Sequence, residues 1–159
     1  MLRKTVLKAT PSKPQRGTGE IEIADVASVV VTSEDPDHPV ENAFDHSRGL
    51  GASEWVAEET GEQSIVLAFD SPHAIRRIAI EVEENEVARS QKVQVLISRD
   101  QEFTYDPLLH QGFNFSPGTN FEREQWELDL KGITHLQLRI MPDTAGKACR
   151  ARLTSLDLW

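Results

Sequence analysis

The side chains best suited to bind an ion lie in a polar loop at residues 33–39. This loop carries three acids, Glu34, Asp35 and Asp37, and its two prolines prevent a regular strand ladder. Carboxylate oxygens are the ligands that calcium prefers. Acidic loops are also common as plain solvated surface, so the sequence leaves both interpretations open here.

Catalytic chemistry finds little support in the sequence. Five histidines are scattered along the chain without the spacing of a metal-binding helix motif, and no serine stands in a nucleophile elbow. Neighbouring acids such as Glu58 and Glu59 point to opposite faces of a strand, so they do not form a general acid and base pair. The sequence predicts a protein that is not an enzyme.

Three side chains are placed for polar contacts with a ligand. His38 and Arg48 lie in the loops on either side of segment 40–45, and Arg89 follows the acidic run 81–86. Imidazole and guanidinium groups bond well to hydroxyls and carboxylates. These residues are therefore candidate ligand-binding residues, with a solvated surface position as the alternative for each.

An aromatic segment offers two further candidates, Phe113 and Asn114. They lie between Gly112 and Pro117, within a stretch rich in turn residues that predicts irregular structure from 103 to 121. These side chains would either be exposed for a ligand or partner, or cover the core. The sequence leaves both possibilities open.

The three tryptophans are predicted to pack inside the protein. Trp55 could stack on a sugar ring through its apolar face, but its position just before the strand-like run 63–69 favours packing. Trp126 and Trp159 alternate with leucines and are likewise predicted core residues.

Length and composition are those of one soluble globular domain. The chain has 159 residues, of which 38% are hydrophobic and 27% charged, and it has no apolar run near the ~20 residues of a membrane span. The first ten residues lack the apolar region of a secretory signal. The lone Cys149 is expected to be reduced and inert. We therefore expect a cytoplasmic protein that does not insert into membranes.

Charge divides the chain into two parts. Residues 1–20 hold five of the 17 Lys and Arg but one of the 26 acids, so the remainder carries 12 basic and 25 acidic residues, a net charge of −13. This remainder would repel a phosphate backbone, which makes duplex nucleic acid an unlikely partner. The sequence predicts a basic polar leader over 1–20 and a single domain over 21–159.

Alternation of apolar and polar residues predicts the fold. Segment 21–32 ends in a β-branched run typical of a strand covered on both faces, and 40–45 fits one helical turn with an apolar side. A turn at 70–73 separates two strands. Some eight short strands with turns between them predict an all-β fold, an antiparallel two-sheet jelly-roll sandwich. The inward-facing residues are expected to be Ile65, Leu67, Phe69, Ile78, Ile80, Val82, Val93, Val95 and Ile97.

Short motifs spread from about Ile21 to Trp159 carry a family resemblance. They are Asn42-Ala43-Phe44-Asp45, Glu54-Trp55, the strand ending Leu67-Ala68-Phe69-Asp70, the strand 75–82, the turn Ser98-Arg99-Asp100 and the strand 136–140. This pattern resembles the galactose-binding-like family, of the discoidin or coagulation factor 5/8 C-terminal type. It is also similar to the amino-terminal domain of the scaffold protein of DNA single-strand-break repair.

The resemblance implies a non-catalytic binding module. Loops at one end of the sandwich would bind a carbohydrate or a similar polar ligand, and the alternative is an intracellular adaptor that binds a protein partner. No cofactor is implied except calcium, which many sugar-binding relatives hold beside the position of Asp45. Ser155 stands where the family often has a second carboxylate, Glu.

Overall fold

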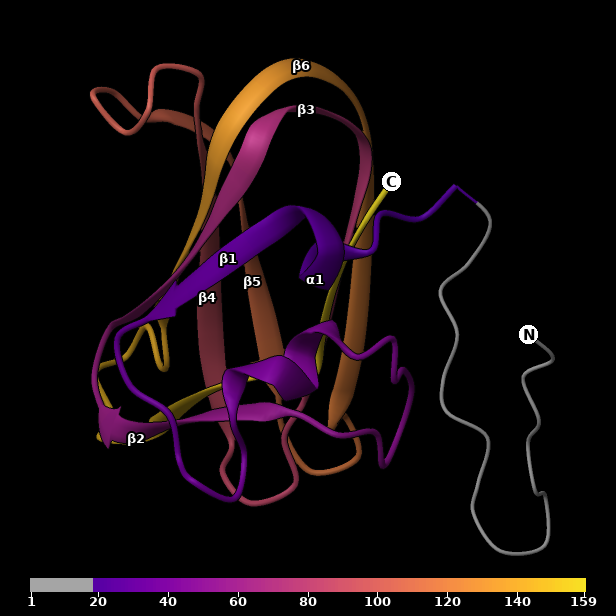
Figure 1. Ribbon diagram of the computed structural model, residues 1–159. Helices are drawn as coiled ribbons and strands as arrows, with labels where there is room; N and C mark the ends of the chain where they lie inside the picture. Colours follow the sequence, from indigo (N-terminus) through magenta and orange to yellow (C-terminus); the bar gives the residue numbers. More distant parts are fainter. Residues whose placement is uncertain (1–18) are drawn as a thin grey trace, which may run out of the picture.

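Two antiparallel sheets form the protein, which is described by a computed structural model over residues 19–159 (Figure 1). The larger sheet has six strands in the order β1-β3-β6-β4-β5, with β8 also paired to β3, and the smaller sheet pairs β2 with β7. The elements are α1 Ile23–Val26, β1 Ala27–Val31, η1 Val40–Phe44, β2 Trp55–Thr60, β3 Gln63–Glu83, β4 Arg89–Ser98, β5 Asp106–Phe115, β6 Phe121–Met141, β7 Arg150–Leu153 and β8 Ser155–Leu158.

The long strands β3 and β6 shape the sandwich. Each spans 21 residues, and the two run antiparallel and arch over together at the top of Figure 1. The first half of β3 also pairs with β1, while its second half pairs with β8. Because β3 and β6 bend over, these two strands contribute to both layers of the sandwich, and the apolar core lies between the two layers.

The core confirms the predicted inward-facing positions, although Ala79 and Glu81, which alternate with them on β3, are buried as well. The nine residues expected to face inward are all buried, and Leu136, Leu138 and Ile140 of β6 join them. Burying one such side chain stabilises the fold by about 1.5–3 kcal/mol. The helical turn at η1 is also confirmed, because Val40, Ala43 and Phe44 are buried.

Two strand predictions need correction. The predicted turn at 70–73 does not reverse the chain. It is the bend of β3, where the pairing register with β6 shifts between Ala68 and His73. The segment 21–32 is a short helix followed by β1, and β1 is an edge strand whose Val30 is 65% exposed. Its β-branched run is therefore covered on one face.

The segment predicted to be irregular contains β5, which pairs with β4 along most of its length. Pro107 is tolerated because β5 lies at the edge of the sheet, where a missing N–H breaks no inner ladder. Phe113 is fully buried, whereas Phe103, before the strand, is 86% exposed.

The predicted leader lies mostly outside the described residues, which begin at Gly19. Glu20, placed in that leader by the sequence, is buried against the folded domain. No helix within residues 19–159 is long and apolar enough to cross a lipid bilayer.

Candidate functional site

Trp159 is the centre of the candidate site. Its backbone bonds to Arg77 in both directions: the Trp159 N–H donates to the Arg77 carbonyl at 3.0 Å, and the Arg77 N–H donates to the Trp159 carbonyl at 3.2 Å. These bonds continue the pairing of β8 with β3. The indole is half-buried, and the Arg77 guanidinium carbon lies 5.1 Å from its ring centroid. The prediction that Trp159 belongs to the core is therefore wrong, since the ring borders open surface.

Two shallow grooves share the Trp159 side chain. The first, here called the Phe121 groove, has a volume of about 450 Å³. It is lined by Arg48, Gly49, Glu81, Phe121, Arg123 and Trp159. The second, the Arg76 groove, has a volume of about 440 Å³ and is lined by Gly19, Arg76, Arg77, Glu127, Leu128 and Trp159. Both combine aromatic or aliphatic surface with arginine and glutamate.

Carboxylates of β3 hold the loop that forms one wall of the Phe121 groove. Glu81 Oε1 accepts the Gly49 N–H at 2.8 Å, and Glu83 Oε1 accepts the Gly51 N–H at 2.8 Å. Gly49 has φ +84°, a left-handed conformation that other residues adopt at a cost. The other oxygen of Glu81 accepts Arg123 Nη1 at 2.6 Å. Glu81 therefore fixes both the loop and the Arg123 guanidinium.

Arg48 reaches the groove from a buried anchor. Its Nε donates to Asp157 Oδ2 at 2.9 Å, and its Nη2 forms an ion pair with Glu20. The side chains of Glu20 and Asp157 are 0% and 2% exposed, whereas that of Arg48 is 28% exposed. Burial raises the pKa of Asp157, and the hydrogen bond and charge of Arg48 oppose that rise. Two buried carboxylates thus hold one side of the Arg48 guanidinium, and its other side lines the Phe121 groove.

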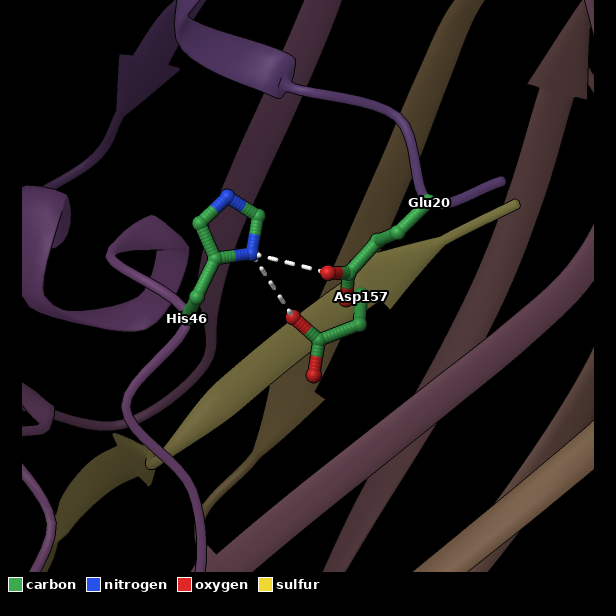
Figure 2. A group of neighbouring side chains, drawn as sticks. All are labelled: Glu20, His46 and Asp157. Carbon is green, nitrogen blue, oxygen red and sulfur yellow. Dashed lines mark ion pairs between the residues drawn. The ribbon is translucent and has the colours of Figure 1, made fainter. Parts of the chain in front are cut away.

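His46 lies beside this anchor (Figure 2). Its Nε2 is 2.8 Å from Glu22 Oε2, and its Nδ1 is 3.1 Å from Glu20 Oε2 and 4.0 Å from Asp157 Oδ1. We call Glu20, Glu22, His46, Arg48 and Asp157 the His46 cluster. It joins the segment before α1, the loop after η1, and β8.

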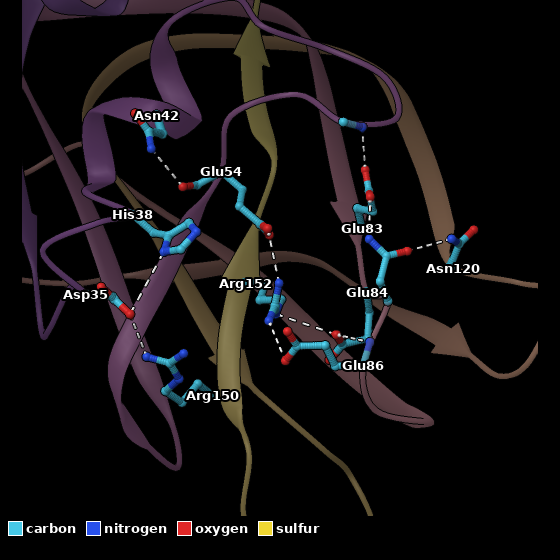
Figure 3. A network of polar contacts seen from close by, with 12 residues as sticks. Asp35, His38, Asn42, Glu54, Glu83, Glu84, Glu86, Asn120, Arg150 and Arg152 are labelled. Atoms are coloured by element: carbon cyan, nitrogen blue, oxygen red, sulfur yellow. Dashed lines mark hydrogen bonds and ion pairs between the residues drawn. The ribbon is translucent and has the colours of Figure 1, made fainter.

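A second polar network lies around β7 (Figure 3). Arg152 contacts Glu54 at 3.1 Å, Glu86 at 3.3 Å and Glu84 at 3.6 Å. Burial raises the pKa of Glu54, and the charge of Arg152 opposes that rise. Arg89 joins through an ion pair of 2.8 Å between its Nε and Glu84 Oε1. We call these five residues the Arg89 network.

The predicted position of Arg89 in an accessible loop is wrong. Arg89 begins β4, and its side chain is 0% exposed. Its Nη1 donates to the carbonyls of Arg150 at 2.7 Å and Pro142 at 3.1 Å. These partners fill the inner side of the strand, so the guanidinium stabilises the fold and presents no surface to a ligand.

The Phe113 side chain does not take the exposed position, which was one of the two possibilities left open by the sequence. Phe113 points into the core from β5 and is fully buried, which is the covering role that the sequence left open. Its neighbour Asn114 points outward, and its Oδ1 accepts the Ser90 hydroxyl at 2.6 Å. Asn114 lines neither groove.

His38 and Arg48, predicted together, lie in different regions. His38 lies near Asp35, with 3.9 Å between Nδ1 and Oδ2, and Asp35 in turn accepts Arg150 at 2.8 Å (Figure 3). It lines neither groove, whereas Arg48 lines the Phe121 groove. Of the predicted ligand-binding residues, Arg48 is therefore the one that the structure brings to this site.

Asp45, the residue at which the family resemblance implies calcium, bonds within its own loop. Its Oδ1 accepts the Ser47 N–H at 3.0 Å and its Oδ2 accepts the Ser53 hydroxyl at 2.5 Å, so both oxygens close the loop. Within residues 19–159, Asp45 belongs to no group of three acidic, His or Cys side chains close enough to share an ion. Calcium takes six to eight oxygen ligands, which include backbone carbonyls and water, so calcium at Asp45 stays a prediction.

Most groove residues were not selected from the sequence. Phe121 and Arg123 are separated by two positions at the start of β6, so their side chains point to the same face. The spacing of an aromatic residue and an arginine by two positions on a strand was the sequence signal that could have identified these two residues. No sequence signal distinguished Glu81, because other acidic residues lie next to it in the sequence.

No family model and no curated protein matches this sequence. Solved structures do match. The family 32 carbohydrate-binding module of Clostridium perfringens NanJ, in complex with galactose, has 12% identity and a TM-score of 0.62, covering 87% of this chain and 96% of that one. The family 32 module of AlyQ, in complex with 4,5-unsaturated mannuronic acid, has 15% identity and a TM-score of 0.60, covering 85% and 95%.

A pectin-binding carbohydrate-binding module matches with 18% identity and a TM-score of 0.59, covering 84% of this chain and 89% of that one. At such low sequence identities, these matches show a shared fold and nothing further. This shared fold confirms the predicted antiparallel jelly-roll sandwich.

Proposed function

We propose that this protein is a non-catalytic module that binds carbohydrate in the Phe121 groove. The observation that carries this proposal is the lining of the groove, where two aromatic rings lie beside two arginines and a glutamate. Aromatic faces stack on the apolar face of a sugar ring. Arginine and carboxylate groups bond to its hydroxyls with defined geometry.

The groove is arranged before a ligand arrives. Asp157 orients Arg48, Glu81 orients Arg123, and two backbone bonds fix Trp159. Groups that are already held lose little conformational entropy on binding. The contact is small and shallow, so we expect affinities of about millimolar to micromolar.

The similar structures support the ligand class. Their names give galactose for one module, 4,5-unsaturated mannuronic acid for another and pectin for the third. These ligands differ in charge and in the orientation of hydroxyls. They favour a saccharide without selecting one.

The test is a calorimetric titration with neutral and acidic mono- and oligosaccharides. We expect at least one to bind, and Trp159→Ala and Arg123→Ala to abolish that binding. Phe103→Ala and Arg99→Ala are matched controls, because both side chains are exposed and line neither groove. If a saccharide still binds to the Trp159→Ala variant, the binding site lies outside the Phe121 groove. If no saccharide binds to the wild-type protein, the proposed function is contradicted.

One observation favours a second candidate function, an intracellular adaptor for a protein partner like the repair scaffold domain. β1 is an edge strand with an exposed Val30, and such edges accept an added strand from a partner. Under this alternative, Val30→Lys would abolish partner binding while the groove variants would not. A cytoplasmic location and the absence of nucleic-acid and membrane partners stay predictions.

A further inference from the structure

The Arg76 groove continues the candidate site beyond Trp159. The Trp159 side chain lines this groove and the Phe121 groove alike. A sugar residue in the Phe121 groove contacts Trp159, so the next residue of a longer saccharide reaches the Arg76 groove. The side chains of that groove therefore decide which second residue the site accepts.

Two neighbouring arginines of β3, Arg76 and Arg77, both line the Arg76 groove. Successive side chains of a regular strand point to opposite faces. The strand is irregular here, because the N–H groups of Arg76 and Arg77 both donate to the Trp159 carbonyl, at 2.5 and 3.2 Å. The register with β6 also shifts between Ile75 and Arg77. Such irregularities redirect side chains, and this one brings two guanidinium groups to one groove beside an indole.

These two guanidinium groups keep free hydrogen-bond donors. Arg77 Nε donates to Glu127 Oε1 at 2.8 Å, and the two Nη nitrogens of Arg77 have no partner in the described part of the chain. The Arg76 side chain is exposed and, within the same part, forms no hydrogen bond or ion pair. In the Phe121 groove, by contrast, Arg48 and Arg123 are both paired with carboxylates. The Arg76 groove therefore has arginine donors to offer a ligand.

The charge of the Arg76 groove is opposite in sign to that of the domain. Two arginines and one glutamate line the groove, a net charge of +1, whereas residues 21–159 hold 12 basic and 25 acidic residues. An acidic domain does not attract anions over long distances. An anion would therefore bind here through short contacts. The planar fork of a guanidinium makes such contacts well with a carboxylate.

We propose that the ligand of this site is an acidic oligosaccharide, with a uronic acid residue in the Arg76 groove. One sugar residue contacts Trp159 from the Phe121 groove, and the carboxylate of the next residue binds Arg76 and the Nη groups of Arg77. Glu127 holds Arg77 through Nε, which leaves the Nη groups open to the ligand. This inference rests on the proposed function, because it places the second residue of the same saccharide.

A plain solvated surface at Arg76 makes a different prediction. Solvated arginines would not distinguish a saccharide carboxylate from its neutral ester, whereas a carboxylate site would. The ratio of the affinities for the acid and for its ester is therefore the quantity to measure.

The experiment is a calorimetric titration of the full chain with trimers of galacturonic acid and of mannuronic acid, each compared with its methyl ester. The ester keeps the rings and the hydroxyls but removes the charge. At neutral pH and low salt, we expect at least one acid to bind about three- to tenfold more tightly than its ester. Added salt should reduce this ratio, because contacts at exposed arginines are screened.

Variants of Arg76 test the assignment through the same ratio. Arg76→Gln should reduce the preference for the acid, and Arg76→Glu should reverse it. Arg76→Lys keeps the charge but loses the fork, so its ratio should lie between those of the wild type and Arg76→Gln. Arg99→Gln is the matched control, because this partly exposed arginine lines neither groove and its loss should leave the ratio unchanged. Since Arg76 is exposed, its variants should keep the stability of the wild type.

Three results would overturn this inference alone. The first is equal binding of acids and esters by the wild-type chain, which leaves the carbohydrate function standing. The second is a preference for the acid that persists in Arg76→Glu, because the carboxylate then binds elsewhere. The third is binding of neutral saccharides when neither acidic trimer binds. If no saccharide of any kind binds, the proposed function fails and the inference fails with it.

Discussion

The Arg89 network and the His46 cluster both pair arginine with carboxylates, but their arginines differ in access to the surface. Arg89 pairs with Glu84, donates to two backbone carbonyls and has no exposed side-chain surface. Arg48 is held by two buried carboxylates on one side and borders a groove on the other. An arginine that also bonds to backbone carbonyls serves the fold, whereas one held only from behind can still meet a ligand.

Removing Arg89 should give the largest effect. Arg89→Ala leaves Glu84 buried beside fewer cations, and breaking a buried ion pair in this way costs about 3–5 kcal/mol. Urea unfolding of the variant should show this loss in the free energy of unfolding. A variant that lost less than about 1 kcal/mol would show that Arg89 is not the structural residue described here.

Trp159→Ala should act on binding rather than on stability. The half-buried ring is outside the apolar core but lines both grooves. We expect saccharide affinity to fall at least about tenfold, equivalent to about 1.4 kcal/mol. Trp55→Ala is the contrast, because this fully buried residue should cost about 3–5 kcal/mol of stability. Equal stability losses in the two variants would contradict the distinction.

Gly49→Ala tests how firmly the groove wall is held. The φ of +84° is disfavoured for alanine, so the substitution should cost about 1–2 kcal/mol and weaken binding as the loop moves. Gly112→Ala is the control, because Gly112 has an ordinary φ and no atom within 4 Å of the added carbon. Unfolding and titration of both variants should separate them, and a Gly49→Ala variant with unchanged affinity would count against a role for this wall.

The smallest expected effect is a pH dependence of the Arg89 network. Burial raises the pKa of Glu54 above its usual value in the unfolded chain. The folded state therefore binds more protons between the two pKa values, and stability falls as pH rises through that window. Glu54→Gln should remove this slope, so that the variant gains relative to the wild type between about pH 4 and neutrality.

Asp100 supplies a control of opposite sign. A hydrogen bond from the Thr104 hydroxyl, with others, lowers its pKa. The contribution of Asp100 to stability is therefore present above the unfolded pKa and is lost as pH falls through the lowered one. Asp100→Asn should lose relative to the wild type at neutral pH, and that difference should fade in acid. Parallel pH profiles for the two variants would contradict both assignments.

The fold could be predicted because its information is local. Alternation at Ile65, Leu67 and Phe69 marks a strand with one buried face whatever its partner. The same local rules failed at 70–73 and at Phe113, where turn-type residues stand within strands. The bend of β3 is stabilised by pairing with β6, and β5 by pairing with β4, so tertiary contacts override the local signal.

The site could be predicted only in part because its contacts are distant in sequence. Arg48 stood out as a cation in a polar loop, but its partner Asp157 is 109 residues away. Trp159 alternates with leucines like a core residue. Its half-exposed position follows from its place beyond the last pair of the β8 ladder, Ile78 with Leu158. A single sequence does not reveal such pairings.

The central claim is that carbohydrate binds beside Trp159, and the most direct test follows the three tryptophan indole N–H signals by NMR during a saccharide titration. Trp159→Phe assigns the relevant signal. The Trp159 signal should move with the sugar, while that of the buried Trp55, whose indole donates to the Ser33 carbonyl, should stay in place. A saccharide that binds by calorimetry but leaves the Trp159 signal unchanged would contradict the claim.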